Sequence, residues 1–493
     1  MHFFLVIFGT VRYNGTHNYK GGIFVIASAA LLREVDNYIA AHEKEMVADL
    51  CRLIEVKSIS APNGSKEAPY GAGCLKSLQV MGDICAQKGL ALQNHENCCA
   101  SLRWGQGCEE LGIFTHLDVV PAGIGWTTDA FTPVVENGFV RGRGSIDNKG
   151  SAIIGLYALD CIRSLKLPMK HAVRLFFGCN EEDMMTDVEY YGQTVGWPKF
   201  TLVPDSMFPA AFAEKGIFAG SVISEPIAGE ILSLKAGDAT NTVASACEIL
   251  LSKKHFEVLR SLADDNIAVT CDGGRTRLYA VGLSAHASIP EQSLNAIGLA
   301  FDALLRSNIL YGKEKELITF WRNALLDVTG RTLGIALDAG EYGLLTVIGG
   351  LANRTEDGRF IFGFNCRYPA SDSCSRIEPL MRAACAEHGL SLTVEEGVDG
   401  FCMPNDHPVV TAMTAVANAL TGEMRAPFLM KGATYCRVIP NAISFGPEMD
   451  NSAPAFPVGR GGIHQPDESL SIKEMLNATK IYVAALLELD AML

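Results

Sequence analysis

The chain of 493 residues lacks several features that would place it in other classes of protein. It has no Cys-x-x-Cys pair, so its 15 cysteines do not have the spacing of a structural zinc site. It also lacks an apolar run of the roughly 20 residues that a membrane-spanning helix needs. Basic residues are too few to balance the acidic ones, and the formal net charge is −14. This shortage of positive charge argues against nucleic acid or an anionic membrane as a partner and suits a divalent cation better.

The cysteines are odd in number and scattered along the chain. This pattern is typical of reduced thiols that pack as small apolar residues, and it predicts a cytoplasmic protein. Residues 1–32 contain two short apolar runs separated by a polar stretch. We expect these residues to be an extension outside the main fold. A weak signal segment and a start codon assigned too early are the alternatives.

The length favours two or three domains, and the composition, 48% hydrophobic and 19% charged, is that of a globular protein. Apolar runs at residues 111–115, 173–179 and 201–204 predict buried strands. They alternate with amphipathic segments such as residues 148–165, which predict helices. Strands that alternate with helices indicate an α/β domain with a mostly parallel central sheet and flanking helices.

The pattern changes to alternating β-like segments with interleaved helices over residues 218–395. We therefore predict an inserted α+β domain, which divides the catalytic domain into residues 33–217 and 396–493. Within the insertion we expect an added helical segment at residues 245–264. Near the C-terminus Ser471 and Glu474 form a capping-box pattern, which predicts the start of a helix.

Polar side chains follow each of the three predicted strands. They are His116 and Asp118 after the first strand, Glu181 and Glu182 after the second, and Asp205 after the third. Asp147 lies in a glycine-rich turn before a predicted helix. In parallel sheets, sites form beyond the carboxyl ends of the strands, so these groups are candidates for one site. Imidazole and carboxylate ligands without thiolate suit zinc, manganese or cobalt in a catalytic centre.

Some roles follow from residue type alone. A carboxylate such as that of Asp147 can bridge two metal ions, which an imidazole cannot do. Of the adjacent Glu181 and Glu182, one can bind metal while the other acts as general base. Asp118 can accept the second imidazole N–H of His116. Each residue taken singly also fits a plain structural role, and it is the recurrence behind successive strands that favours a metal site.

The motifs together resemble the di-zinc metallopeptidase family of carboxypeptidase G and aminoacylase, and most of all its bacterial dipeptidases of the peptidase V type. The resemblance covers the chain from about residue 34 to the C-terminus. The motifs that carry it are residues 115–123, Trp126 with 129–133, 142–150, Glu181-Glu182, Pro204-Asp205, 214–216, 284–286 and 461–465.

The resemblance implies a role for each matching residue. His116 and Asp205 would hold one metal ion, Glu182 and His464 the other, and Asp147 would bridge them. Glu181 would be the general base and Asp118 would orient His116. The insertion would be a lid, from which His286 stabilises the oxyanion and Asn241 and Arg367 contact substrate. Gly432 and Thr434 match a loop that meets the substrate carboxylate. The chain departs from the usual motif at Asn148, where an aspartate is common, and at Ala433, where a glycine is common.

The sequence thus predicts a metal-dependent dipeptidase that cleaves small unblocked dipeptides. Two divalent metal ions are expected, zinc first, with manganese or cobalt as alternatives. The same machinery would serve an N-acyl amino acid deacylase, and a metal- or peptide-binding protein without catalysis is the alternative from another class. The long insertion favours a monomer over a homodimer. We expect neither nucleic acid nor membrane as a partner.

Overall fold

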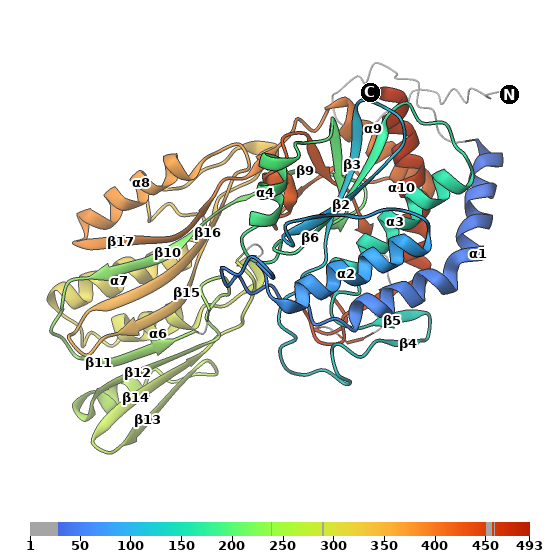
Figure 1. Cartoon of the computed structure of the whole chain (residues 1–493). Helices are drawn as coiled ribbons and strands as arrows, with labels where there is room; N and C mark the ends of the chain where they lie inside the picture. The colour runs from blue at the N-terminus through green and yellow to red at the C-terminus, as the bar shows by residue number, and fades with distance from the viewer. Residues whose placement is uncertain (1–27, 238, 288–289, 450–455, 458) are drawn as a thin grey trace. The chain divides into compact units, whose positions relative to one another are not determined.

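The computed structural model describes residues 28–237, 239–287, 290–449, 456–457 and 459–493 (Figure 1). The chain forms two compact units, which are treated separately below. Unit 1 comprises the residues up to Phe212 together with Met403–Phe428 and Thr434–Leu493. Unit 2 comprises Ala213–Cys402 and Leu429–Ala433. The domain boundaries expected from the sequence, 217/218 and 395/396, lie a few residues from the positions where the chain passes between the units, 212/213 and 402/403.

The sheet of unit 1 confirms the predicted α/β class. Its strand order is β1-β2-β6-β3-β7-β20-β9. The four central strands β6, β3, β7 and β20 are parallel to one another, whereas β1 pairs with β2, β2 with β6 and β9 with β20 in the antiparallel direction. The strands span β1 Gln93–His95, β2 Cys99–Trp104, β3 Glu110–His116, β6 Ala172–Gly178, β7 Phe200–Val203, β9 Ala211–Glu214 and β20 Ala442–Ser444.

Helices cover this sheet: α1 Ala29–Ile54, α2 Ala72–Gln87, α3 Lys149–Ser164, α4 Thr186–Thr194, α9 Pro408–Thr421 and α10 Ile472–Met492. Helix α3 is buried from Lys149 to Ile162, and it packs against α1 and α10 (Figure 1). The Ser471 side chain accepts a hydrogen bond from the Glu474 N–H at 3.4 Å, as the capping pattern predicts. Helix α1 starts within the residues expected to form the N-terminal extension, and residues 1–27 lie outside the described part of the chain.

Smaller strand pairs position loops of unit 1. Strands β4 (Val134–Glu136), β5 (Phe139–Arg141) and β22 (Ser469–Ser471) form a three-stranded sheet, and β8 (Ser206–Met207) pairs with β21 (Pro447–Glu448). Because β5 and β22 are antiparallel neighbours, the segment before Asp147 lies beside the segment after His464. Over the described residues, every helix is too short or too polar to cross a bilayer.

Unit 2 is built on an antiparallel sheet in the order β13-β14-β12-β11-β15-β16-β10-β17. The strands are β10 Gly216–Ser224, β11 Ile231–Ala236, β12 Ala246–Ser252, β13 Ile267–Asp272, β14 Arg275–Val281, β15 Thr346–Arg354, β16 Phe360–Tyr368 and β17 Leu390–Val398. Helices α6 (Ala296–Arg306), α7 (Gly312–Leu326) and α8 (Cys374–Glu387) run along it (Figure 1). Their apolar side chains and those of the sheet form one large core, in which Trp321 packs against Phe362 with the two rings tilted. This is the predicted α+β insertion.

One predicted element of unit 2 is wrong. The sequence indicated a helical segment at residues 245–264, but its first part is strand β12, followed by a 3-10 turn at Lys253–His255 and the short helix α5 (Phe256–Arg260). Within β12 the side chains of Cys247, Ile249 and Leu251 are buried. This period of two belongs to a strand with one face in the core, and β12 pairs with both β11 and β14.

Candidate metal centre

The parallel strands of unit 1 bring the predicted polar residues to one edge of the sheet. Strand β3 ends at His116, and β6 ends just before the segment that carries Glu181 and Glu182. Strand β7 ends at Val203, two residues before Asp205. Because β3 lies between β6 and β7 and is parallel to both, the three carboxyl ends are adjacent. The fold thus gathers residues that are far apart in the sequence.

Asp147 lies between two imidazoles. Its Oδ1 is 3.1 Å from Nε2 of His116, and its Oδ2 is 3.0 Å from Nε2 of His464. The residue sits in the turn before α3, and its peptide bond to Asn148 is cis. One carboxylate therefore faces two nitrogen ligands through different oxygens, which is the position that a bridging metal ligand occupies.

Two groups of potential ligands share Asp147. His116 and Asp205 complete the first group, and the distance between His116 Nε2 and Asp205 Oδ2 is 3.8 Å. Glu182 and His464 complete the second, with His464 Nε2 at 3.1 Å from Glu182 Oε2. In each group the ligand atoms lie within 4.8 Å of one another. The structure thus brings together all five residues that the sequence proposed as metal ligands.

The polar atoms at the centre fit a bound cation. Among the described residues, the buried atoms without a hydrogen-bond partner include His116 Nε2, Asp147 Oδ1 and Glu181 Oε1. His116 Nε2 and Asp147 Oδ1 are close, but their relative orientation is not that of a hydrogen bond. Buried polar atoms are rarely left unpaired, so atoms that converge in this way indicate a ligand between them. The nitrogen and oxygen donors are those expected for zinc, manganese or cobalt.

The charges of the centre are also unbalanced without a cation. Burial, and then repulsion by Asp205, raises the pKa of Glu181 well above its usual range. Burial and the nearby Asp147 raise the pKa of Glu182 to about 7, and the same two causes raise the pKa of Asp205. Each shift reflects a carboxylate held away from water beside other carboxylates. Divalent cations would offset this repulsion.

Neighbouring carboxylates also raise the pKa of both imidazoles, and Asp147 acts on each of them. Burial alone would lower the pKa of His116, but the nearby carboxylates of Asp118 and Asp147 outweigh it and raise the pKa well above the usual value. For His464 burial is likewise outweighed by Asp147 and Glu182, and its pKa rises to about 10. A metal ion would take the place of these protons, because only neutral imidazole is a ligand.

Asp118 holds the centre differently from the expectation. The sequence suggested that its carboxylate binds the imidazole of His116, but the nearer acceptor is its backbone carbonyl, to which His116 Nδ1 donates at 3.0 Å. The carboxylate lies 3.4 Å from Nδ1 and accepts the backbone N–H groups of Glu181 at 3.2 Å and Glu182 at 3.1 Å. Donation from Nδ1 leaves Nε2 of His116 for metal. Asp118 therefore fixes both the imidazole and the glutamate segment.

Asn148 is a residue whose contribution the sequence did not reveal. Its side-chain amide donates to Asp205 Oδ1 at 2.8 Å and to the carbonyl of Pro204 at 2.7 Å, and its side-chain oxygen accepts the N–H of His116 at 3.3 Å. An ionised aspartate cannot donate a hydrogen bond. What appears in the sequence as a lost charge is therefore a donor that orients a neighbouring carboxylate.

The remaining candidates belong to other segments of the chain. In unit 2 an isolated β-bridge joins Thr242 to His286, and the N–H of Ala287 donates to the carbonyl of Asn241, so Asn241 and His286 are close together. Arg367 is buried on β16. Gly432 belongs to the short return segment of unit 2, and Thr434 to unit 1, where its buried hydroxyl accepts the N–H of Cys436. Their roles in substrate binding stay predictions.

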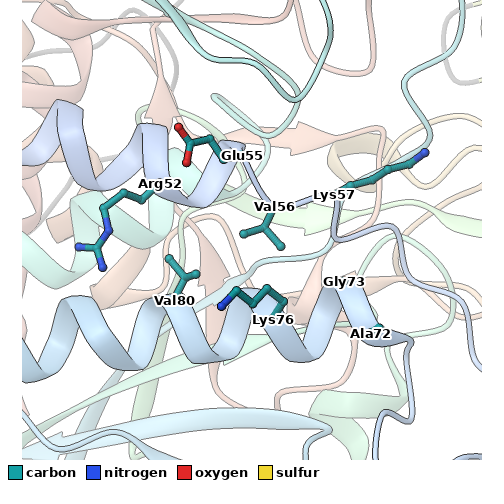
Figure 2. Close-up of a pocket in the computed structure, with 8 residues that line it drawn as sticks. All are labelled: Arg52, Glu55, Val56, Lys57, Ala72, Gly73, Lys76 and Val80. Atoms are coloured by element: carbon teal, nitrogen blue, oxygen red, sulfur yellow. The ribbon is translucent and has the colours of Figure 1, made fainter.

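A surface cavity of about 540 Å³ lies apart from these residues, between the end of α1 and the first half of α2 (Figure 2). Its lining includes the charged residues Arg52, Glu55, Lys57 and Lys76, and none of the predicted site residues. In Figure 2 the charged ends of Arg52 and Lys57 point in opposite directions. These two cations therefore do not converge on one ligand.

Comparison with known proteins supports the resemblance seen in the motifs. The model of peptidase family M20/M25/M40 matches residues 112–488. The chain belongs to this family. It is therefore a hydrolase of the metallopeptidase class, and the family implies divalent metal ions at the centre described above.

Two bacterial proteins illustrate the similarity in sequence. The Bacillus subtilis (strain 168) protein named "Putative dipeptidase YtjP" is 27% identical over 463 residues, which cover 91% of this chain and 97% of that protein. The Staphylococcus aureus (strain MRSA252) protein named "Putative dipeptidase SAR1836" is 25% identical over 468 residues, which cover 92% of this chain and 98% of that protein. Both alignments span nearly the whole of each chain.

Solved structures show the same fold. Human carnosine dipeptidase 1 aligns with a TM-score of 0.55 at 14% identity, covering 94% of this chain and 100% of that one. The di-peptidase Dug1p from Saccharomyces cerevisiae aligns with a TM-score of 0.55 at 12% identity, and the alignment covers 93% of this chain and 98% of that one. At such low identity the likeness concerns the fold alone.

Proposed function

We propose that this metallopeptidase is a dipeptidase that cleaves small unblocked dipeptides with two divalent metal ions, zinc first and manganese or cobalt as alternatives. The observation that carries the proposal is the placement of Asp147 between His116 and His464, with a further carboxylate beside each imidazole. His116, Asp147 and Asp205 would hold one ion, and Asp147, Glu182 and His464 the other. The dipeptidase names of the bacterial relatives support the choice of substrate.

Glu181 is the proposed general base. It is buried at the centre, its Oε2 is 3.8 Å from His116 Nε2, and its Oε1 is one of the unpaired atoms. The metal ions, when bound, acidify water and polarise the scissile carbonyl. Glu181 removes a proton from the attacking water and returns it to the leaving amine.

Residues outside the ligand set complete the proposal. Asp118 is the positioning residue for His116 and for the glutamate segment. His286 is proposed to stabilise the oxyanion, and Asn241 and Arg367 to contact the substrate. Gly432 and Thr434 are proposed to meet its carboxylate. The basis for these substrate roles is the match of each residue to a family motif.

The quaternary state and location are part of the proposal. All 15 cysteines are described, and none forms a disulfide, which favours a cytoplasmic protein. We propose a monomer, with a homodimer as the alternative.

Paired substrates test the choice of amide bond. Purified protein with added zinc would be assayed on Ala-Ala, N-acetyl-Ala-Ala and N-acetyl-Ala, with release of free alanine as the readout. A dipeptidase is expected to cleave Ala-Ala and to leave both acetylated compounds intact. Cleavage of N-acetyl-Ala in preference to Ala-Ala would replace the proposal with an N-acyl amino acid deacylase. Zinc binding without turnover of any of the three would leave a binding protein.

A further inference from the structure

A buried ion pair adjoins the candidate metal centre and contacts the turn that carries Asp147. Arg143 Nη1 donates to Glu468 Oε2 at 2.6 Å, and the two side chains are 1% and 0% exposed. Neither residue is a metal ligand candidate. We infer that Arg143 and Glu468 are positioning residues that set the places of Asp147 and His464. The inference rests on the proposed metal-dependent function of this centre.

Glu468 fixes the turn that carries the shared ligand. Its Oε1 accepts the backbone N–H groups of Ile146 at 2.9 Å and Asp147 at 3.1 Å. Its backbone carbonyl accepts the N–H of Gly142 at 2.9 Å, so the residue binds the turn at both ends. Two bonds to successive N–H groups determine the direction in which the Asp147 side chain leaves the backbone. That direction decides whether one carboxylate can face both imidazoles.

Arg143 connects two further segments, residues 121–122 and the segment of His464, to Glu468. Its Nη2 points at the carbonyls of Pro121 and Ala122, at 3.4 and 3.3 Å, and at the carbonyl of His464, at 3.4 Å. The guanidinium also lies 5.2 Å from the ring centroid of Trp126. A planar fork with five donors can serve several carbonyls at once, which a lysine ammonium cannot do in the same geometry.

The surrounding contacts hold the two segments in register. Asp467, next to Glu468, accepts the N–H of Thr127 at 2.9 Å and its hydroxyl at 2.7 Å, and it pairs with Arg460. Through these bonds and the β5–β22 pairing, the segment of His464 is anchored on the loops that flank the turn of Asp147.

Stability alone is a weak reason for such a pair. Removing two charges from water costs about as much as their attraction returns, so buried ion pairs are often replaceable by apolar residues. If the pair positions the metal ligands, altering it should change the affinity for metal and not only the stability of the fold. Residues that orient metal ligands typically change metal affinity by about 10–100-fold when they are altered.

The test measures zinc affinity with a competing colorimetric chelator on wild type, Glu468→Gln and Arg143→Lys. Glu468→Gln removes the negative charge and presents a donor to Arg143, so both ions should bind about 10–100-fold more weakly, since Asp147 serves both. Arg143→Lys keeps the charge beside Glu468 but cannot reach every carbonyl. This variant should chiefly lower the affinity for the zinc ion that His464 and Glu182 would hold. Because it is a second, independent variant, the test stays decisive if Glu468→Gln does not fold.

A matched control separates positioning from stability. Arg174 and Glu110 form an ion pair at 2.6 Å, with side chains 12% and 17% exposed, and Glu110 begins the strand that His116 ends. Glu110→Gln should lower the melting temperature and leave both zinc affinities unchanged. Unchanged zinc affinities in Glu468→Gln or in Arg143→Lys, with only a lower melting temperature, would overturn the inference. Wild type that binds no zinc would instead overturn the proposed function.

Discussion

The two units of this chain arrange polar residues in opposite ways. In unit 1 the central strands are parallel, and the residues after His116, Gly178 and Val203 meet at one edge. In unit 2 every pair in the large sheet is antiparallel, so successive strands end at opposite edges. A parallel sheet with crossover helices collects residues from distant parts of the sequence at one place. An antiparallel sheet needs loops or bridges to do the same.

The interiors differ accordingly. The core of unit 2 is a large apolar cluster of sheet and helix side chains, in which Phe362 contacts both Phe301 and Trp321, and a small second cluster of three apolar residues. Unit 1 has an apolar core as well, but a cluster of carboxylates and imidazoles lies at the end of its sheet, with His116, Asp147 and Glu181 buried. Burying charge is costly unless it is paired or bound to metal. We therefore expect changes near that cluster to alter chemistry, and changes in the unit 2 core to alter stability.

The largest effect is expected for Glu181→Gln. The amide keeps the shape of the side chain but cannot accept the proton of the attacking water, so kcat for dipeptide hydrolysis should fall by about 10²–10⁴-fold. Zinc stoichiometry, measured by atomic absorption, should not change, because Glu181 is not a proposed ligand. Turnover close to wild type would exclude Glu181 as the base.

Asn148→Asp should produce the next largest effect. The side-chain amide of Asn148 donates to Asp205 Oδ1 at 2.8 Å, and the variant replaces this donor with a carboxylate. The affinity for the zinc ion that His116 and Asp205 would hold should therefore fall by about 10–100-fold. Asn418→Asp is a matched control, because the Asn418 amide donates to the carbonyl of Arg425 in α9 and the following loop. Isothermal titration with zinc would compare the variants. Equal affinities in all three proteins would contradict the positioning role of Asn148.

Arg367→Lys probes the proposed role of unit 2. Loss of a paired hydrogen bond to a substrate carboxylate should raise KM for a dipeptide about tenfold, with a smaller change in kcat. Arg354→Lys on the neighbouring strand β15 is the control, since Arg354 donates to the carbonyl of Ile227. If both variants have the same KM as wild type, Arg367 does not grip the substrate.

The smallest effect on the metal centre is expected for Leu304→Ala. Leu304 is completely buried in the core of unit 2, so its truncation should lower the free energy of unfolding by about 2–5 kcal/mol. Denaturant unfolding would measure this loss, and chelator competition should show unchanged zinc affinity. A weakened zinc centre would mean that the core of unit 2 and the centre of unit 1 are energetically coupled.

Much of unit 1 could be predicted because its signals are local and strong. The strand before His116 is a continuous apolar run, and the Ser471 cap is followed by a helix at Ile472. The order of motifs also identified four of the five ligand candidates that the structure brings together. His464 needed the family resemblance, because no spacing rule connects it to the others.

The parts that could not be predicted depend on side-chain direction. Nothing in the sequence distinguishes the carbonyl of Asp118 from its carboxylate as the partner of His116. The contribution of Glu468 depends on a contact with a turn that is more than 300 residues away in the chain. The sequence of strand β12 also fits a helix, because a short apolar run is compatible with both periods.

The most direct measurement is dipeptide hydrolysis by protein stripped of metal, titrated with zinc, while bound zinc is counted in parallel. The account predicts no hydrolysis without metal and a rise in activity that reaches its plateau at two zinc ions per chain. Manganese or cobalt in place of zinc would show which ion supports the highest rate. Full hydrolysis by protein without metal, or two bound zinc ions without any hydrolysis, would contradict it.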